Sequence, residues 1–138
     1  MAAGGPTSPM YPRNAALTEL FRAAALRHAL REALVDGDLR LSYRDLDGLS
    51  DAWAIRLRRR GVSPGDPVGV YVERSWVFVV AVLAVLKAGG FYVPLAPDHP
   101  AERVRLLVED MGLRVVVARA GMLPNLLPPE VEVEVVGR

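Results

Sequence analysis

The chain has 138 residues, of which 51% are hydrophobic and 24% are charged, with 17 basic and 16 acidic side chains. This length suits one ordinary domain with a core of its own. The net charge of +1 argues against nucleic acid or an anionic membrane as the main partner. Because cysteine is absent, disulfides and thiolate metal sites are excluded.

The N-terminal residues and the longest apolar run indicate where in the cell the protein is expected. Residues 1–16 contain no apolar core of a signal peptide and predict a flexible lead-in. The run from Trp76 to Leu86 is far shorter than the roughly 20 residues needed to cross a bilayer, so it predicts a buried core element. We therefore expect a cytoplasmic protein whose single domain spans residues 17–138.

A helix and a hairpin are predicted first. Apolar residues spaced three and four apart between Leu17 and Leu26 indicate an amphipathic helix. Asp36 and Gly37 then stand between two short alternating stretches. This pair predicts a tight hairpin turn, because glycine accepts the positive φ that such a turn requires.

A second helix follows the hairpin. Ser42 can cap its first turn and Asp45 can reach back to the cap, as in a capping box. The helix is expected to end at Gly61. Just before this end, Arg56 and residues 58–60 form the densest basic cluster. No aromatic residues interleave with it, so we interpret the cluster as a solvated helix end rather than a nucleic-acid site.

The remainder alternates strands and helices. The expected elements are a strand at 68–72, a helix at 76–88, a strand at 91–95, a helix at 101–111, a strand at 114–118, a short helix at 121–127 and a strand at 131–136. This alternation predicts an α/β fold with a mostly parallel sheet flanked by helices, preceded by a helix and a small hairpin. The last strand places Val131, Val133 and Val135 on one face and glutamates on the other, as in a half-buried strand.

Local patterns name no catalytic, cofactor-binding or metal-ligating residue. Gly89 and Gly90 lie at the C-terminal end of a helix, where carbonyl groups disfavour phosphate, so we interpret them as a helix end. His28 and His99 have no second ligand at metal-binding spacing. The acidic stretches at 36–38 and 45–48 lack the full spacing of a calcium loop, which favours turn and cap roles.

Two motifs nevertheless point to a family. LSYRDL at residues 41–46 and LKAGGFYVPL at residues 86–95 resemble the first two core motifs of nonribosomal peptide synthetase adenylation domains. The similarity extends over about residues 17–118. The matching positions are Leu41, Ser42, Tyr43, Asp45, Leu46, Leu86, Lys87, Ala88, Gly89, Gly90, Tyr92, Val93 and Pro94.

The resemblance implies a partial N-terminal subdomain of the adenylate-forming ligase fold. Complete family members use Mg-ATP to activate a carboxylate as an acyl-adenylate and pass the acyl group to a carrier-protein thiol. Both motifs are chiefly structural in that family. Three positions depart from the family pattern: Asp45 replaces glutamate, Phe91 replaces a small residue and Ala96 replaces aspartate.

The family's phosphate loop, amino-acid pocket, ribose-binding aspartate and catalytic lysine all follow the matched region. The only lysine of this chain, Lys87, already belongs to the second motif. The resemblance therefore implies no catalytic residue, metal site or cofactor for this chain alone.

We thus expect a truncated adenylation domain that is inactive alone and works through a protein partner or a homodimer, with Val131, Val133 and Val135 as a possible interface strand. The partner would be the rest of an adenylation domain, a synthetase or carrier-protein machinery. One alternative is half of a split enzyme that forms aminoacyl-AMP once complemented. Another is a piece excised from a full synthetase.

Overall fold

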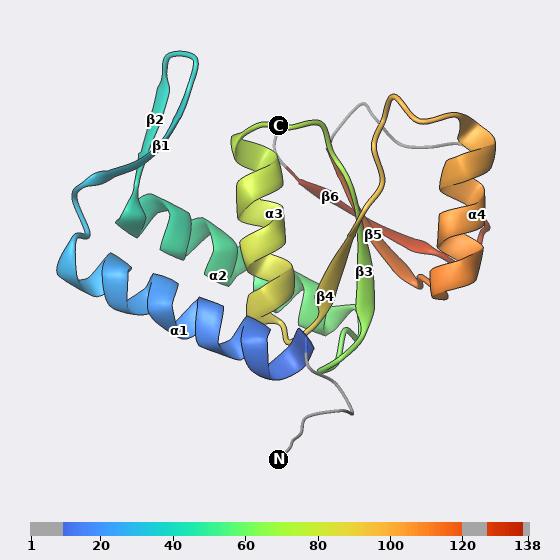
Figure 1. Cartoon of the computed structure of the whole chain (residues 1–138), viewed down its shortest axis with the longest axis horizontal. Helices are drawn as coiled ribbons and strands as arrows, with labels where there is room; N and C mark the ends of the chain where they lie inside the picture. Colours follow the sequence, from blue (N-terminus) through green and yellow to red (C-terminus); the bar gives the residue numbers. More distant parts are fainter. Residues whose placement is uncertain (1–9, 120–126, 137–138) are drawn as a thin grey trace.

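Two sheets of different kinds organise the chain (Figure 1). In this computed structural model, residues 10–119 and 127–136 are described. Strands β1 (Glu32–Asp36) and β2 (Leu39–Ser42) form an antiparallel hairpin. The larger sheet is parallel and has the order β4-β3-β5-β6. Its strands are β3 (Pro67–Tyr71), β4 (Phe91–Pro94), β5 (Val115–Arg119) and β6 (Glu132–Val136).

Helices cover both faces of the parallel sheet. They are α1 (Met10–Arg27), α2 (Tyr43–Arg59), α3 (Trp76–Lys87) and α4 (Ala101–Met111). In Figure 1, α4 lies on one side of the sheet, whereas α2 and α3 lie on the other with α1 packed outside them. Since β4 and β5 lie on opposite sides of β3, right-handed crossovers place α3 and α4 on opposite faces. The predicted α/β fold with a flanked parallel sheet is therefore confirmed.

Each sheet face has its own apolar core. Val68 and Val70 of β3, and Val72 just after it, alternate along the chain and pack toward α2 and α3. On the opposite face, Val116 of β5 packs with Val104 of α4 and neighbouring apolar side chains. These strands are nearly continuous apolar runs, which is the pattern of a parallel sheet covered on both sides.

The predicted capping box at the start of α2 is confirmed. The Asp45 N–H donates to Ser42 Oγ over 3.1 Å, and the Ser42 N–H donates to the Asp45 carboxylate over 2.9 Å. These bonds from the Ser42 backbone and side chain hold the pKa of Asp45 below its usual value. At the other end, Gly61 adopts φ 95°, a conformation that favours glycine.

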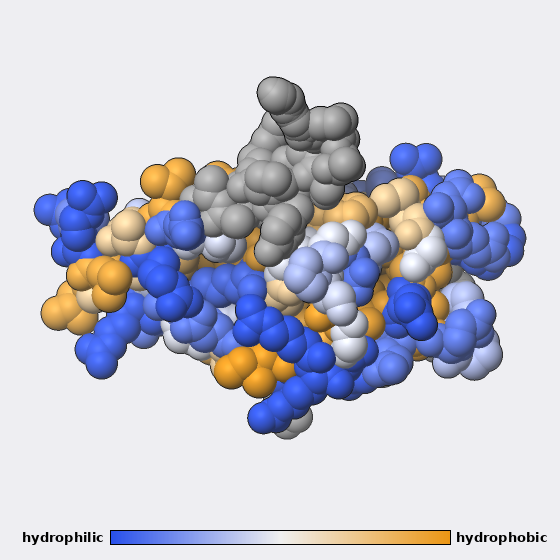
Figure 2. Space-filling view, turned by 90° about the horizontal axis from the view of Figure 1, so that it is seen from below, coloured by the Kyte–Doolittle hydropathy of each residue, from blue (hydrophilic) through white to orange (hydrophobic). Residues whose placement is uncertain are grey.

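Helix α1 differs from its prediction. It begins at Met10 rather than Leu17, and it turns Phe21 and Ala25 toward the protein while Leu20 and Leu26 are exposed. The reason is that α1 sits outside the layer of α2 and α3 and contacts it along a narrow side. Seen from that side, hydrophobic patches interrupt the hydrophilic surface (Figure 2).

The last strand also differs from its prediction. Val131 precedes β6 and is buried near α4, while Val133 and Val135 are only half-buried. The face expected to be exposed contains Glu134, which is only 6% exposed. The reversal arises because the glutamates of β6 face the arginines at the end of α2.

Those arginines are not a merely solvated helix end. Arg60 Nε donates to the Glu134 carboxylate over 2.5 Å, and a second nitrogen of Arg60 contacts Glu132 over 2.9 Å. Arg56 also pairs with Glu134. The bond to Glu134 raises the pKa of Arg60. These ion pairs tie β6 to α2.

The expected short helix at 121–127 falls almost entirely outside the described residues. Within the described ranges, no helix combines the length and apolar character required to span a bilayer.

Candidate functional site

A crevice lies at the carboxyl ends of the parallel strands. The chain leaves β3 toward β4 on one side and later returns to β5 on the other. Such a switch in strand order opens a crevice between the two connections, which is where open α/β sheets bind ligands. The residues that follow β3 and the last residue of β5 therefore meet at this point.

Two adjoining cavities of about 600 Å³ and 500 Å³ occupy this edge. Both include Glu73 and Arg74, which follow β3. The larger cavity is lined by Val70, Val72, Glu73, Arg74, Phe78, Pro94, Leu95, Ala96, Pro97 and Asp98. Its floor is therefore apolar, and its charged groups stand at the rim.

The rim carries both signs of charge. Arg119, at the end of β5, lies 3.6 Å from the Glu73 carboxylate. Among the described residues, Arg74 and Asp98 form no hydrogen bond or ion pair with one another or with their neighbours. The arrangement can orient a polar ligand over an apolar floor. The hydroxyl of Ser75, which lines the smaller cavity, donates to the main-chain carbonyl of Glu73 over 3.1 Å.

The nearby N-terminus of α3 is already occupied. The Trp76 N–H donates to the Asp36 carboxylate over 2.9 Å, and Ser75 Oγ caps the Phe78 N–H. Asp36 thus does more than begin the hairpin turn, because its charge also complements the positive end of the helix dipole. The sequence did not predict this crevice. Its position depends on the order of the strands in the sheet, and local sequence patterns do not determine that order.

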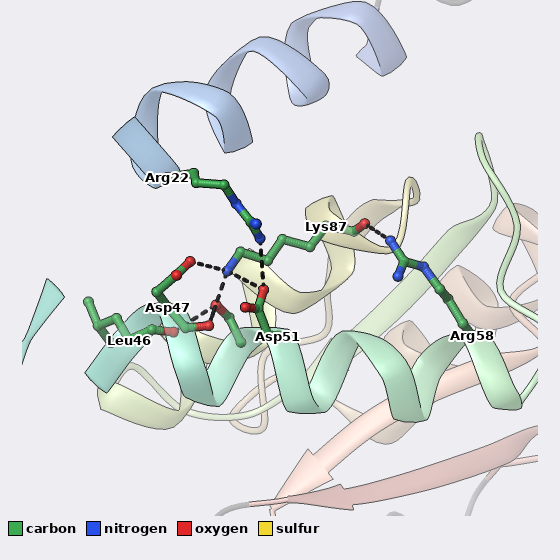
Figure 3. A network of polar contacts seen from close by, with 7 residues as sticks. Arg22, Leu46, Asp47, Asp51, Arg58 and Lys87 are labelled. Carbon is green, nitrogen blue, oxygen red and sulfur yellow. Dashed lines mark hydrogen bonds and ion pairs between the residues drawn. The ribbon is translucent and has the colours of Figure 1, made fainter. Parts of the chain in front are cut away.

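The lysine of the second family motif, at residues 86–95, is the centre of an ion-pair network (Figure 3). Lys87 Nζ donates to Asp47 Oδ1 over 2.7 Å, to the Asp47 carbonyl over 3.2 Å and to Asp51 Oδ1 over 2.8 Å. Its side chain is only 6% exposed. The ammonium also lies 5.5 Å from the ring centre of Phe21, within cation–π range. Lys87 therefore links α3 to α2 and α1.

Two arginines extend the network at its margins. Arg22 of α1 contacts the same oxygen of Asp51 over 3.1 Å. Arg58 of α2 donates to the main-chain carbonyl of Lys87 over 2.5 Å, where the helix leaves that carbonyl without an internal partner. Asp47 is thus an ion-pair partner of Lys87, while the cap role predicted for the stretch at 45–48 is filled by Asp45.

The glycines of the second motif shape the turn into β4. Gly89 adopts φ 92° directly after the C-cap of α3, which confirms the predicted helix end. A Cβ atom on Gly90 would lie 2.7 Å from the Asp66 carbonyl oxygen. Only glycine allows this approach of the turn to the start of β3. Tyr92, Val93 and Pro94 follow within β4.

The first motif is also structural in its placement. Leu41 and Leu46 are buried, and the rings of Tyr43 and Phe21 lie 6.0 Å apart. His28 is exposed, whereas Nδ1 of His99 is buried without a hydrogen-bond partner among the described residues. No group of three or more potential metal ligands occurs in the described part of the chain.

A family model described as AMP-binding enzyme matches residues 21–137. The chain belongs to this family. Bacitracin synthase 3 from Bacillus licheniformis is 41% identical over 114 residues, covering 83% of this chain and 2% of that protein. Solved structures agree: the nonribosomal peptide synthetase FmoA3, bound to α-methyl-L-serine-AMP, is 38% identical with a TM-score of 0.82.

The match to FmoA3 covers 86% of this AMP-binding family member and 14% of the solved chain. An artificially fused adenylation–PCP di-domain, NpsA-ThdA from Klebsiella oxytoca, shares the fold with a TM-score of 0.76 at 23% identity. That match covers 86% of this chain and 22% of the other. The chain thus matches adenylation-domain structure over a small part of each relative's length. The predicted family is confirmed.

Proposed function

We propose that this chain supplies the first parallel sheet of a nonribosomal peptide synthetase adenylation domain and adenylates an amino acid only when a partner polypeptide supplies the remaining motifs. The observation that carries the proposal is the environment of Lys87. The only lysine of the sequence donates three hydrogen bonds within the scaffold, so it holds helices together instead of reaching a substrate.

The partner we propose is a chain with the phosphate loop, the amino-acid pocket and the catalytic lysine of the resembled family. ATP and Mg would then bind chiefly to that partner. The crevice beside Glu73 and Arg74 would face the shared site, because carboxyl ends of parallel strands are where such folds place ligands. A carrier protein is the expected acceptor of the acyl group.

ATP–pyrophosphate exchange tests the proposal. The chain is assayed alone, then with an FmoA3 adenylation segment that lacks the region matched here, with α-methyl-L-serine as substrate. The FmoA3 segment alone is the control. Exchange only in the mixture supports the proposal, and exchange by this chain alone overturns it.

A mixture that forms a complex without exchange favours the second candidate, a structural or regulatory partner of a synthetase. Half-buried apolar side chains of α3 favour contact with another protein, because a helix that is apolar on all sides is normally covered on all sides. Gel filtration of the same mixture separates this outcome from absence of binding.

A further inference from the structure

We infer that the outer edge of β6 is a docking site for an extended peptide strand in which apolar residues alternate with neutral or basic ones. This inference rests on the proposed function, because it names the surface through which the partner polypeptide would bind. Of the three valines predicted to form an interface strand, only Val133 and Val135 belong to the proposed docking edge.

Backbone direction defines that edge. The Glu132 N–H donates to the Arg114 carbonyl over 2.9 Å, on the side of β5. Because the N–H and C=O of one residue in a strand point to the same side, Glu134 also faces β5 while Val133 and Val135 face outward. Arg56 confirms the direction, since its guanidinium donates to the Val135 carbonyl over 2.7 Å.

The edge keeps three backbone groups for a new strand. Within the described residues, the N–H groups of Val133 and Val135 and the carbonyl of Val133 have no hydrogen-bond partner. Two donors and one acceptor on alternate residues are what an added strand pairs with. The fourth outward group, the Val135 carbonyl, already accepts a hydrogen bond from Arg56, so a partner strand can pair only with the first part of β6.

The opposite edge of the sheet is less suitable. Along β4, Phe91 and Leu95 donate toward β3, so Tyr92 and Pro94 point outward. Pro94 has no N–H to donate, and proline is a common way to close a sheet edge. Helix α1 also contacts β4. A partner strand therefore extends the sheet beyond β6.

The two faces of β6 set the chemistry of the partner. Val133 and Val135 are half-buried on the α4 side, so an added strand would continue this apolar row with apolar residues. On the α2 side, Glu132 is exposed and Glu134 is buried. Neutral or basic residues in the partner suit this row.

This charge pattern argues against a second copy of the chain as the occupant. Two β6 strands paired antiparallel around a two-fold axis would place glutamate opposite glutamate on the α2 side. Like charges directly opposite in a sheet are destabilising. A basic or neutral strand meets no such penalty.

Amide hydrogen exchange tests the site directly. The probe is an end-blocked peptide of about ten residues that alternates valine with threonine and lysine, and its control carries glutamate in place of lysine. We expect the lysine peptide to slow exchange at Val133 and Val135 but not at Tyr92. Equal protection by both peptides, no protection at β6, or protection that grows with protein concentration without peptide would each overturn the inference.

A matched pair of variants isolates the backbone. Val133→Pro removes an outward N–H without breaking pairing to β5, whereas Val133→Thr keeps that N–H and the branched shape. We expect the proline variant to weaken peptide binding roughly tenfold or more and the threonine variant to bind normally. Thermal unfolding shows whether both fold. If Val133→Pro folds and binds normally, the inference is wrong.

The Val133→Pro variant also distinguishes the proposed function from the proposed docking site on β6. Complemented ATP–pyrophosphate exchange that survives Val133→Pro leaves the proposed function intact and places the partner elsewhere. Peptide docking without any complemented exchange retains the strand site and removes the proposed function.

Discussion

The carboxylate of Glu134 and the guanidinium of Arg60 lie 74 positions apart in the sequence and only 2.5 Å apart in the folded chain. The Glu134 side chain is 8% exposed, whereas that of Arg60 is 33% exposed. Removing Arg60 and removing Glu134 should therefore cost different amounts of unfolding free energy.

We expect Arg60→Ala to be more destabilising than Glu134→Val. Removing Arg60 leaves a buried carboxylate with Arg56 as its remaining cation, at a cost of roughly 2 kcal/mol. Removing the carboxylate leaves arginines that can turn to water, and valine suits a strand, so the cost should be within about 1 kcal/mol. Urea unfolding of both variants measures the order, and the reverse order would contradict this account.

Lys87→Met tests the ion-pair network between the helices. Methionine keeps the apolar stem but leaves Asp47 and Asp51 facing each other without the ammonium, so we expect a loss of about 2 kcal/mol in unfolding free energy. Adding Asp47→Asn and Asp51→Asn should recover part of that loss. Arg105→Gln, which removes exposed pairs on α4, is the control and should leave stability unchanged. If the triple variant is no more stable than Lys87→Met, the loss comes from packing and not from the unpaired carboxylates.

Alanine substitutions at Gly90, in the second family motif, and at Gly48, in α2, form a test and its control. Gly90→Ala would press a methyl group against the Asp66 carbonyl and should destabilise the protein by about 1–3 kcal/mol. Gly48→Ala, within α2 and facing open space, should stabilise it by about 0.5–1 kcal/mol because alanine favours helix. Thermal unfolding measures both. Tolerance of alanine at Gly90 would show that the turn can shift.

Acid should weaken the capping box. The bonds from Ser42 lower the pKa of Asp45 in the folded chain below its ordinary 3.8. The resulting stabilisation is fully present above the unfolded-state pKa and is lost as the pH falls through the folded one. The stability difference between the wild type and Asp45→Asn should therefore shrink below about pH 4. A difference that is constant over this range would contradict the assignment.

Sequence patterns predicted most of the fold, because its signals are local. Ser42 and Asp45 are three residues apart, and Gly89 directly follows its helix, so their roles are visible in short windows. The alternation of strands and helices likewise indicated the parallel sheet.

Long-range pairing was the part that sequence alone left open. Nothing near Glu134 indicates that Arg60, at the C-cap of α2, will cover it, which is why the glutamate face of β6 was predicted to be exposed. Nor does the strand order follow from periodicity, so the meeting of Glu73 with Arg119 had no local signal.

The burial of Lys87 turns the chain's one side-chain amine into a sensor of local opening. We expect an amine-reactive ester to acylate Nζ only after α1, α2 and α3 separate enough to break its contacts with Asp47 and Asp51. The labelling rate of this single side chain, compared with that of an unfolded chain, thus measures the free energy of opening the helical layer. A partner that clamps the layer would slow that rate without touching the lysine.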